Sequence, residues 1–434
     1  MQQCRNFIVL FLVLITLWGC ETNSKKHRVL ADFIPKSSQT VLKIKNWETT
    51  REDFKKNLLI GELENDPFSP FFTDKNSVFQ FLKPSQKALL CYEKTNDGVA
   101  QFTFITKISP SLFQIDSLEG IQQTQISFAG KTIQKIQYKE REVFSIQWDS
   151  IFMLSTSEGL IKESLEGKTK NEPTFLKALK LKNDEELAYV TQLNEGDTLP
   201  IWASWASFEL QLLPDGLVGN GVLLEQDSLL QLLSVFKGQV PQKNEAPTII
   251  PVKATKAHSF TFQNMAAFQK NLQKYKKDSL NLDPTFETIN EVVEIQMEGQ
   301  PIVCLKSLDP QITWDYLAKY ISEKETFREV PLFEFTEETP FFGGFSPLLT
   351  NTSYRIVFQW EDFFVFTQSQ TIAEQLIADY QNHTVLASAP FFESANTQLA
   401  QASSFTAYSL QGKVEGLFRN FWAERLHACH TSLW

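Results

Sequence analysis

Two stretches of this chain are nearly the same phrase, roughly half the chain apart. Phe144–Ser157 reads FSIQWDSIFMLSTS, and Val357–Ser369 reads VFQWEDFFVFTQS. When Gln147-Trp148 is placed over Gln359-Trp360, aromatic, apolar and serine positions continue to match toward the end of both stretches. Self-similarity of this kind indicates that a structural unit is repeated along the chain.

The phrase predicts a strand, a tight turn, a second strand and a helix. Its first half is rich in β-branched and aromatic residues, which favour strands. Asp149-Ser150 and Glu361-Asp362 are turn residues whose side chains can bond to their own backbone. The Ser/Thr residues that close each phrase are typical helix N-caps. Trp148 and Trp360 then become hairpin positions, which we interpret as core packing against the helix, with a ligand platform as the alternative.

Further matches extend the similarity over most of the chain. They keep the same order, and their offset drifts smoothly: Phe54–Leu58 with Phe268–Leu272, Asp66-Pro67 with Asp283-Pro284, Cys91 with Cys304, and Ala188-Tyr189 with Ala407-Tyr408. We interpret this as the duplication of one domain of about 210 residues, within the usual size of a domain.

The repeated unit is predicted to be α+β. Strands are expected at residues 40–44, 88–92, 99–108, 124–128 and 187–193, with helices at 53–59, 173–181 and 228–236. Asp215-Gly216 joins strands 208–212 and 217–224 in a hairpin. No glycine-rich strand-to-helix turn supports a parallel sheet. We therefore expect two tandem pseudo-repeats of antiparallel sheet with helices on one face.

The proposed boundaries follow from this pattern. Prolines in the polar stretch 238–258 separate the copies. The second copy lacks a counterpart of the 208–224 hairpin, so we expect it to be incomplete, through truncation of the chain or through loss of its end. The segments are a signal peptide at 1–19, a tether at 20–31, repeat 1 at 32–240, repeat 2 at 255–426, and an atypical tail at 427–434.

The N-terminal segment predicts the subcellular location of the protein. Arg5 is followed by the apolar run Phe7–Trp18, which is shorter than the roughly 20 residues that span a bilayer. The run ends in Leu17-Trp18-Gly19-Cys20, which resembles the lipobox of bacterial lipoproteins. That resemblance implies lipidation of Cys20 and membrane attachment through its acyl chains. The expected location is the bacterial cell envelope, with the outer membrane as the expected membrane.

The whole pattern resembles a group of uncharacterised bacterial lipoproteins that carry domains of unknown function. The lipobox, the opening strand Thr40–Asn46 and the duplicated α+β domains carry this resemblance. It implies location and architecture, and it implies no activity.

Charge and cysteine content exclude some classes of protein. The net charge of -10 argues against a nucleic-acid partner, which requires clustered Lys and Arg. Cys4 lies in the signal segment, and the spacing of Cys91, Cys304 and Cys429 does not suggest a disulfide framework. We expect no cofactor and no metal. His427, Cys429 and His430 form a short cluster that lacks a fourth zinc ligand nearby.

The sequence contains no strong catalytic motif. Gly344-Phe345-Ser346-Pro347 departs from the nucleophile elbow, because Pro347 follows the serine directly. The aromatic loop Phe341–Phe345 is interpreted as a loop that crosses between two strands, or alternatively as an exposed loop that binds a partner. A hydrolase would require Ser346, His383 and a carboxylate to converge.

Three functions therefore remain open. The first is a non-catalytic, lipid-anchored envelope lipoprotein that acts as a binding or scaffold module for a protein partner or ligand. The second is a periplasmic carrier of a hydrophobic ligand, for which a cavity lined by Phe is the expected sign. The third is a hydrolase with a site at the domain interface.

Overall fold

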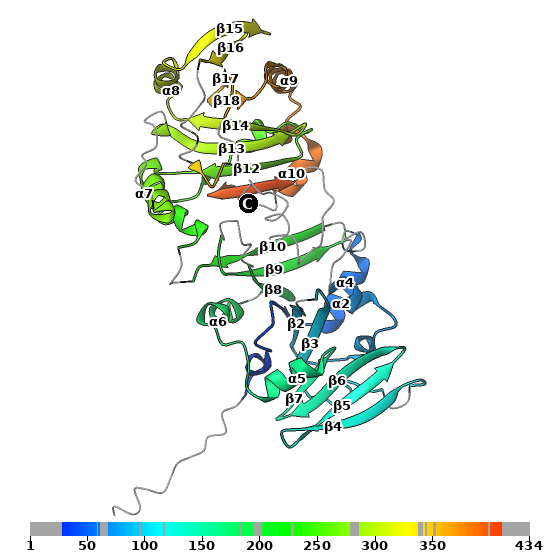
Figure 1. The fold of residues 1–434 in the computed structure, drawn as a ribbon. Coiled ribbons are helices and arrows are strands. Elements are labelled where there is room, and N and C mark those ends of the chain that lie inside the picture. The colour runs from blue at the N-terminus through cyan, green and yellow to red at the C-terminus, as the bar shows by residue number, and fades with distance from the viewer. Residues whose placement is uncertain are drawn as a thin grey trace, which may run out of the picture.

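The computed structural model describes residues 28–58, 60, 68–95, 97–115, 118–182, 184–193, 202–214, 216–226, 230–277, 286–336, 342, 345–349, 353–397 and 400–409. Its main elements are two large antiparallel sheets, of ten and eight strands, with helices packed against them (Figure 1). The mixed helix and antiparallel sheet composition that the sequence predicts is confirmed.

The first sheet has the strand order β10-β9-β8-β1-β2-β3-β7-β6-β5-β4, and every described pairing in it is antiparallel. Its strands are β1 (Thr40–Ile44), β2 (Ala88–Lys94), β3 (Ala100–Lys107), β4 (Gln122–Phe128), β5 (Lys131–Tyr138), β6 (Arg141–Trp148), β7 (Ile151–Ser155), β8 (Leu187–Gln192), β9 (Trp205–Leu213) and β10 (Gly216–Leu224).

The second sheet has the order β15-β16-β17-β18-β14-β13-β12-β20. Its strands are β12 (Lys256–Thr261), β13 (Ile289–Met297), β14 (Gln300–Ser307), β15 (Ile321–Phe327), β16 (Val330–Phe335), β17 (Ile356–Trp360), β18 (Phe363–Thr367) and β20 (Phe405–Ser409). A separate two-stranded ladder joins β11 (Gln242–Lys243) to β19 (Ala402–Ser403).

The two near-identical phrases form β6–β7 and β17–β18, and these hairpins take the same place in the order of their sheets. Gln147 pairs with Phe152 in the first hairpin, and Gln359 pairs with Phe364 in the second. Asp149 and Ser150 both have positive φ, as a two-residue turn with the twist of a hairpin requires. The prediction of a strand–turn–strand unit is confirmed in both places.

Two of the matched pairs nevertheless occupy different places. Cys91 lies in β2, beside β1, whereas Cys304 lies in β14, beside β18. Tyr189 packs with Leu42 in one cluster of the first sheet. Tyr408 packs with Ala257 on one side of the second sheet, whereas Phe260, in the same strand as Ala257, packs on the other side. The matching of the two cysteines is wrong because their strands take different places in the two sheets. The matching of the two tyrosines is wrong because strand neighbours alternate between faces and a small slip exchanges the faces.

The expectation that helices cover one face is also wrong. α2 (Trp47–Lys56) packs with Leu42 and Ile44 on one face of the first sheet. α5 (Glu158–Leu165) and α6 (Pro173–Lys180) pack with Val41 on the opposite face. Since both faces of β1 carry apolar side chains, each face requires its own cover.

The second sheet is covered in the same way. We name its two sides the α7 face and the α9 face, after α7 (Met265–Lys276) and α9 (Gln370–Gln381). Phe260 and Phe268 belong to the cluster on the α7 face, and Val293 and Leu376 belong to the cluster on the α9 face. The other described helices are η1 (Leu30–Phe33), α4 (Phe68–Thr73), η2 (Val78–Phe81), η3 (Leu232–Phe236), η4 (Ala246–Thr248), α8 (Pro310–Leu317), η7 (Leu386–Ser388) and α10 (Pro390–Asn396).

Local signals explain where the main helices begin. The Asn46 side chain accepts a hydrogen bond from Thr49 N and caps α2, and Asn264 caps α7 through Ala267 N. Ser369 caps α9 by accepting from Ile372 N, as the sequence predicts, whereas Ser157 stands before α5 without a side-chain cap. α2 begins at Trp47, earlier than the predicted residue 53, because Asn46 supplies the cap.

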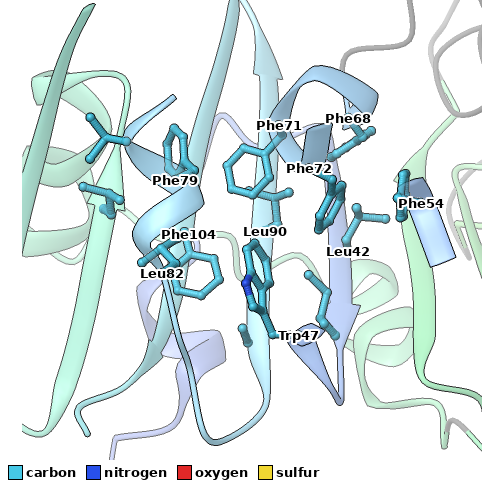
Figure 2. Packing of buried hydrophobic residues seen from close by; sticks show 14 of the residues in the cluster. Leu42, Trp47, Phe54, Phe68, Phe71, Phe72, Phe79, Leu82, Leu90 and Phe104 are labelled. Atoms are coloured by element: carbon cyan, nitrogen blue, oxygen red, sulfur yellow. The ribbon is translucent and has the colours of Figure 1, made fainter. Parts of the chain in front are cut away.

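The aromatic content is concentrated in the cores. Figure 2 shows the cluster beneath α2 and α4, in which Trp47, Phe54, Phe71 and Phe72 pack ring against ring. Phe54 and Phe72 are stacked with their ring centroids 4.2 Å apart. Aromatic pairs at such distances add to the free energy gained from apolar burial.

The expected boundary between the copies is corrected by packing. Residues 238–258 are not an exposed linker, since Ile249 and Ile250 are fully buried on the α9 face. His258, expected in the linker, lies within β12 and is buried. η3, predicted to close the first unit, instead packs with Phe260 and Phe262 in the core of the second.

The predicted hairpin of strands 208–212 and 217–224 is confirmed as β9–β10, but Gly216, expected in the turn, pairs with Leu213 within the ladder. Trp202, just before β9, stacks on Phe405 of β20 with ring centroids 4.8 Å apart, so the segment that leads into the first sheet contacts the second sheet. No helix in the described part of the chain is long and apolar enough to cross a membrane. The signal segment, the matched pair at Asp66 and Asp283, and the tail 427–434 lie outside the described residues.

Candidate functional site

The Ser346 and His383 pair does not form a catalytic site. Ser346 lies between Phe345 and Leu348, which are buried in the cluster on the α7 face. His383 is exposed and follows Tyr380, which belongs to the cluster on the α9 face. The sheet lies between the two clusters, and a nucleophile and its base must be within hydrogen-bond reach. The convergence that a hydrolase would require is therefore not supported by the packing of the neighbouring residues.

The two tryptophans of the repeated phrase are half-buried packing residues. Trp360 packs against Tyr380 of α9, with ring centroids 5.4 Å apart, which confirms its contact with the helix. Trp148 instead meets Phe33 of η1, 5.4 Å away and edge-on. Arg28 and Lys131 each lie 4.1 Å from the Trp148 ring centroid, so this ring is also engaged in cation–π contacts.

Other residues proposed from the sequence cannot be placed. Cys20, the proposed lipidation site, and the His427, Cys429 and His430 cluster lie outside the described residues. Within the described ranges, no group of three or more His, Cys, Asp or Glu side chains is arranged to hold a metal ion. Of the aromatic loop, Phe342 and Phe345 are described, and both are buried in the core on the α7 face.

The two described cysteines are buried thiols. Burial raises the pKa of Cys91 to about 12, and it raises the pKa of Cys304 further still. A thiol is a nucleophile only as the thiolate. Neither cysteine is therefore suited to nucleophilic chemistry or disulfide exchange in the folded protein.

The most polar buried cluster surrounds Glu291, which the sequence analysis missed. Ser259 Oγ donates to Glu291 Oε1 at 2.6 Å, and the backbone amides of Glu245 and Ala246 donate to the two carboxylate oxygens at 3.1 and 3.0 Å. Asn244 donates in turn to Ser259 Oγ at 3.1 Å. The carboxylate thus ties the segment before η4 to the strands beneath it.

Burial raises the pKa of Glu291, although its hydrogen bonds oppose the shift. A carboxylate whose pKa is shifted is often found in a catalytic site. Here three donors bond to the carboxylate and the side chain is 1% exposed, which fits a structural anchor. The alternation of Glu291 with Val292 and Val293 in a strand was the available sequence signal, since a carboxylate in a buried strand needs partners.

A hollow of about 410 Å³ lies close to this cluster. Lys306 forms an ion pair with Glu245 at its wall, and Lys243 pairs with Glu245 at 3.1 Å. The turn Glu361-Asp362 of the repeated phrase and Glu393 of α10 contribute further acidic groups. Its lining mixes both signs of charge, and the described cations already pair with Glu245.

A second hollow, of about 350 Å³, lies on the first sheet beside the segment 108–115. The strands contribute amide and hydroxyl side chains, and the segment and the core contribute apolar ones: Gln123, Thr132, Gln134, Ser145 and Gln147, with Leu112, Phe113, Ile115, Ile136 and Phe152. Among the described residues that line it, none has a charged side chain. Its volume lies within the range of small-molecule sites, and its lining combines hydrogen-bonding groups with apolar ones.

Comparisons with known proteins add little to this geometry. No family model and no curated protein matches the chain. Among solved structures, a chain titled "Structure of crystal form III of TP0453" is 8% identical to this one, with a TM-score of 0.22. The match covers 81% of this chain and 98% of that chain. A likeness at this TM-score carries no argument about fold or function.

Proposed function

We propose that the chain is a lipid-anchored, non-catalytic binding module of the bacterial cell envelope. The observation that carries the anchor is Leu17-Trp18-Gly19-Cys20 directly after a short apolar run. Multiple acyl chains on one residue would hold the protein at a membrane, since one chain binds only marginally. The first described residue, Arg28, follows Cys20 closely in sequence, so the folded part would lie near that membrane.

The binding role is supported by the hollow on the first sheet. Residues of β4 to β7 form one side of it, the segment 108–115 forms the other, and its lining is uncharged. The strands hold their side chains more rigidly than loops do. The neighbours of Ser346 and of His383 pack on opposite faces of a sheet, which gives the hydrolase hypothesis no support.

We also propose that the two sheets arose by duplication of one domain. The order β4-β5-β6-β7-β3-β2-β1-β8 in the first sheet parallels β15-β16-β17-β18-β14-β13-β12-β20 in the second. Asparagine caps the helix after β1 and the helix after β12. Among the described residues, the second sheet has no strands at the places of β9 and β10.

The hydrophobic-carrier hypothesis has less support. It requires a cavity lined by Phe, whereas the Phe-rich clusters of both sheets pack ring against ring. The two hollows described above carry polar side chains in their linings.

The intact mass of the protein extracted from membranes of its native host tests the anchor. We expect a species that begins at a diacylated or triacylated Cys20, and a Cys20→Ser variant that is unmodified and no longer sediments with membranes. An unlipidated wild-type protein in the soluble fraction would refute the anchor. Photo-crosslinking in intact cells, followed by mass spectrometry, tests the binding role; the absence of any adduct to the first sheet would refute it.

A further inference from the structure

The same place in the two sheets is covered in different ways. Gln147 and Gln359 each precede the tryptophan of the repeated phrase, and each pairs across its hairpin with a buried phenylalanine, Phe152 or Phe364. In the first sheet the chain between β3 and β4 passes over this place as the segment 108–115. In the second sheet the chain between β14 and β15 forms α8.

The second sheet fills the place with an indole ring. Trp314 of α8 lies 5.1 Å from Phe364 and 4.8 Å from Phe333, measured between ring centroids. Its Nε1 donates a hydrogen bond to the Gln359 side-chain carbonyl. An aromatic ring packed on aromatic neighbours, with its N–H bonded to an amide oxygen, satisfies both the apolar and the polar needs of indole.

The first sheet fills only part of the corresponding place. Phe113 packs on Phe152, with ring centroids 5.5 Å apart, as Trp314 does on Phe364. The strand registers put Gln134 and Ser145 where the second sheet has Phe333 and Val357. Smaller or more polar groups therefore replace a packed aromatic layer, and the hollow of about 350 Å³ lies there.

We propose that this hollow binds an uncharged indole-type ring, either as a free compound or as the tryptophan side chain of a peptide. This inference rests on the proposed binding role and names its ligand chemistry. The ring packs beside Phe113 over the buried floor of Ile136 and Phe152. Its N–H donates to the Gln147 carboxamide oxygen, the counterpart of the Gln359 oxygen that accepts from Trp314. The uncharged lining suits a neutral ring, because an ion would lose its hydration without gaining a partner.

Isothermal titration calorimetry of the full chain tests the proposal, with indole and N-acetyl-tryptophanamide as probes. We expect saturable binding of one equivalent. Gln147→Ala, at an exposed position, removes one hydrogen bond and should weaken binding by about threefold to tenfold. Gln134→Phe introduces the second sheet's residue into the hollow and should weaken binding by at least about tenfold. Gln359→Ala is the matched control, and it should leave the affinity unchanged.

The two probes distinguish the sources of the ring. Tighter binding of N-acetyl-tryptophanamide supports a peptide side chain, and tighter binding of indole supports a free compound. No heat of binding from either probe at millimolar concentration would overturn the proposal, as would affinities that Gln147→Ala and Gln134→Phe leave unchanged. Binding of the neutral disaccharide cellobiose at the hollow, with both ring probes inert, would also overturn it. Crosslinks to the first sheet that persist in such a case would leave the proposed binding role standing.

Discussion

Ser259 and Glu291 lie on neighbouring strands in the interior, and the Ser259 hydroxyl donates a 2.6 Å hydrogen bond to the Glu291 carboxylate. Ser259 also accepts a hydrogen bond from Asn244, so one hydroxyl connects β12, β13 and the segment before η4. The segment that looks like a linker in sequence is therefore held against the second sheet by a buried polar network.

Removal of this hydroxyl should destabilise the protein. In Ser259→Ala, the buried Glu291 carboxylate loses a donor, and the half-buried Asn244 loses an acceptor. We expect a loss of about 1–3 kcal/mol in the free energy of unfolding, measured by urea denaturation. Ser322→Ala, at an exposed position of the edge strand β15, is the control and should stay within about 0.5 kcal/mol of wild type. Equal effects of the two variants would contradict the structural role of Ser259.

The pH dependence of stability should reveal the buried carboxyl. Burial raises the pKa of Glu291 above its ordinary value of 4.5 in the folded state. The folded state therefore holds the proton more tightly than the unfolded chain does. The resulting stability is complete below pH 4.5 and is lost as the pH rises through the raised folded pKa.

Differential scanning calorimetry of wild type and Glu291→Gln tests this sign. The Tm of the wild type relative to that of Glu291→Gln should fall as the pH is raised through that window, because the glutamine does not ionise. A difference in Tm that stays constant, or that grows with pH, would show that the hydrogen bonds outweigh burial at this carboxyl.

The core beneath α2 offers a matched pair of substitutions. Phe54 is 1% exposed and stacks on Phe72, whereas Leu58, close by in sequence, is 69% exposed. Phe54→Ala should cost about 3–5 kcal/mol of unfolding free energy, through lost burial and the cavity that is left. Leu58→Ala should change it by less than about 0.5 kcal/mol. Urea denaturation measures both, and a tolerated Phe54→Ala would show that this cluster is not a packed core.

The buried thiols should be protected in the folded state. Cys91 and Cys304 are shielded from solvent, and burial raises the pKa of both, so little thiolate exists at neutral pH. Iodoacetamide should leave both unmodified in native protein and alkylate both in denaturant. Peptide mass spectrometry measures the extent of alkylation at each cysteine separately. Rapid native alkylation of either peptide would mean that its strand opens readily.

Local sequence was sufficient to predict many elements. The hairpin of β9 and β10, the β-branched run at Thr40–Ile44 and the strands of the repeated phrase all have signals that lie within a few residues. Strand β5 was missed because the apolar residues of Lys131–Tyr138 do not alternate strictly with polar ones, although Ala129 and Gly130 form a turn with positive φ before it. Helix ends were less predictable, since a cap such as Asn46 is one residue among several candidates.

The placement of side chains was less predictable. Cys91 and Cys304 looked equivalent in the linear sequence, but strand pairing puts them in β2 and β14. Ser346 and His383 looked like possible partners, but the residues beside them, Phe345 and Tyr380, pack on opposite faces of the second sheet. Equivalence and proximity both depend on which strands pair and in what register, and these are long-range properties.

The sequence by itself determined the repeated strand–turn–strand phrase, the antiparallel character of the fold and the lipobox-like motif at Cys20, because each depends on neighbouring residues. The tertiary structure decided that helices cover both faces of each sheet and that the segment before β12 is anchored on Glu291. It also decided that Trp314 packs on the second sheet, whereas the first sheet has a hollow beside Phe113. These features arise from contacts between residues far apart in the chain, where packing and the pairing of buried polar groups outweigh local preference.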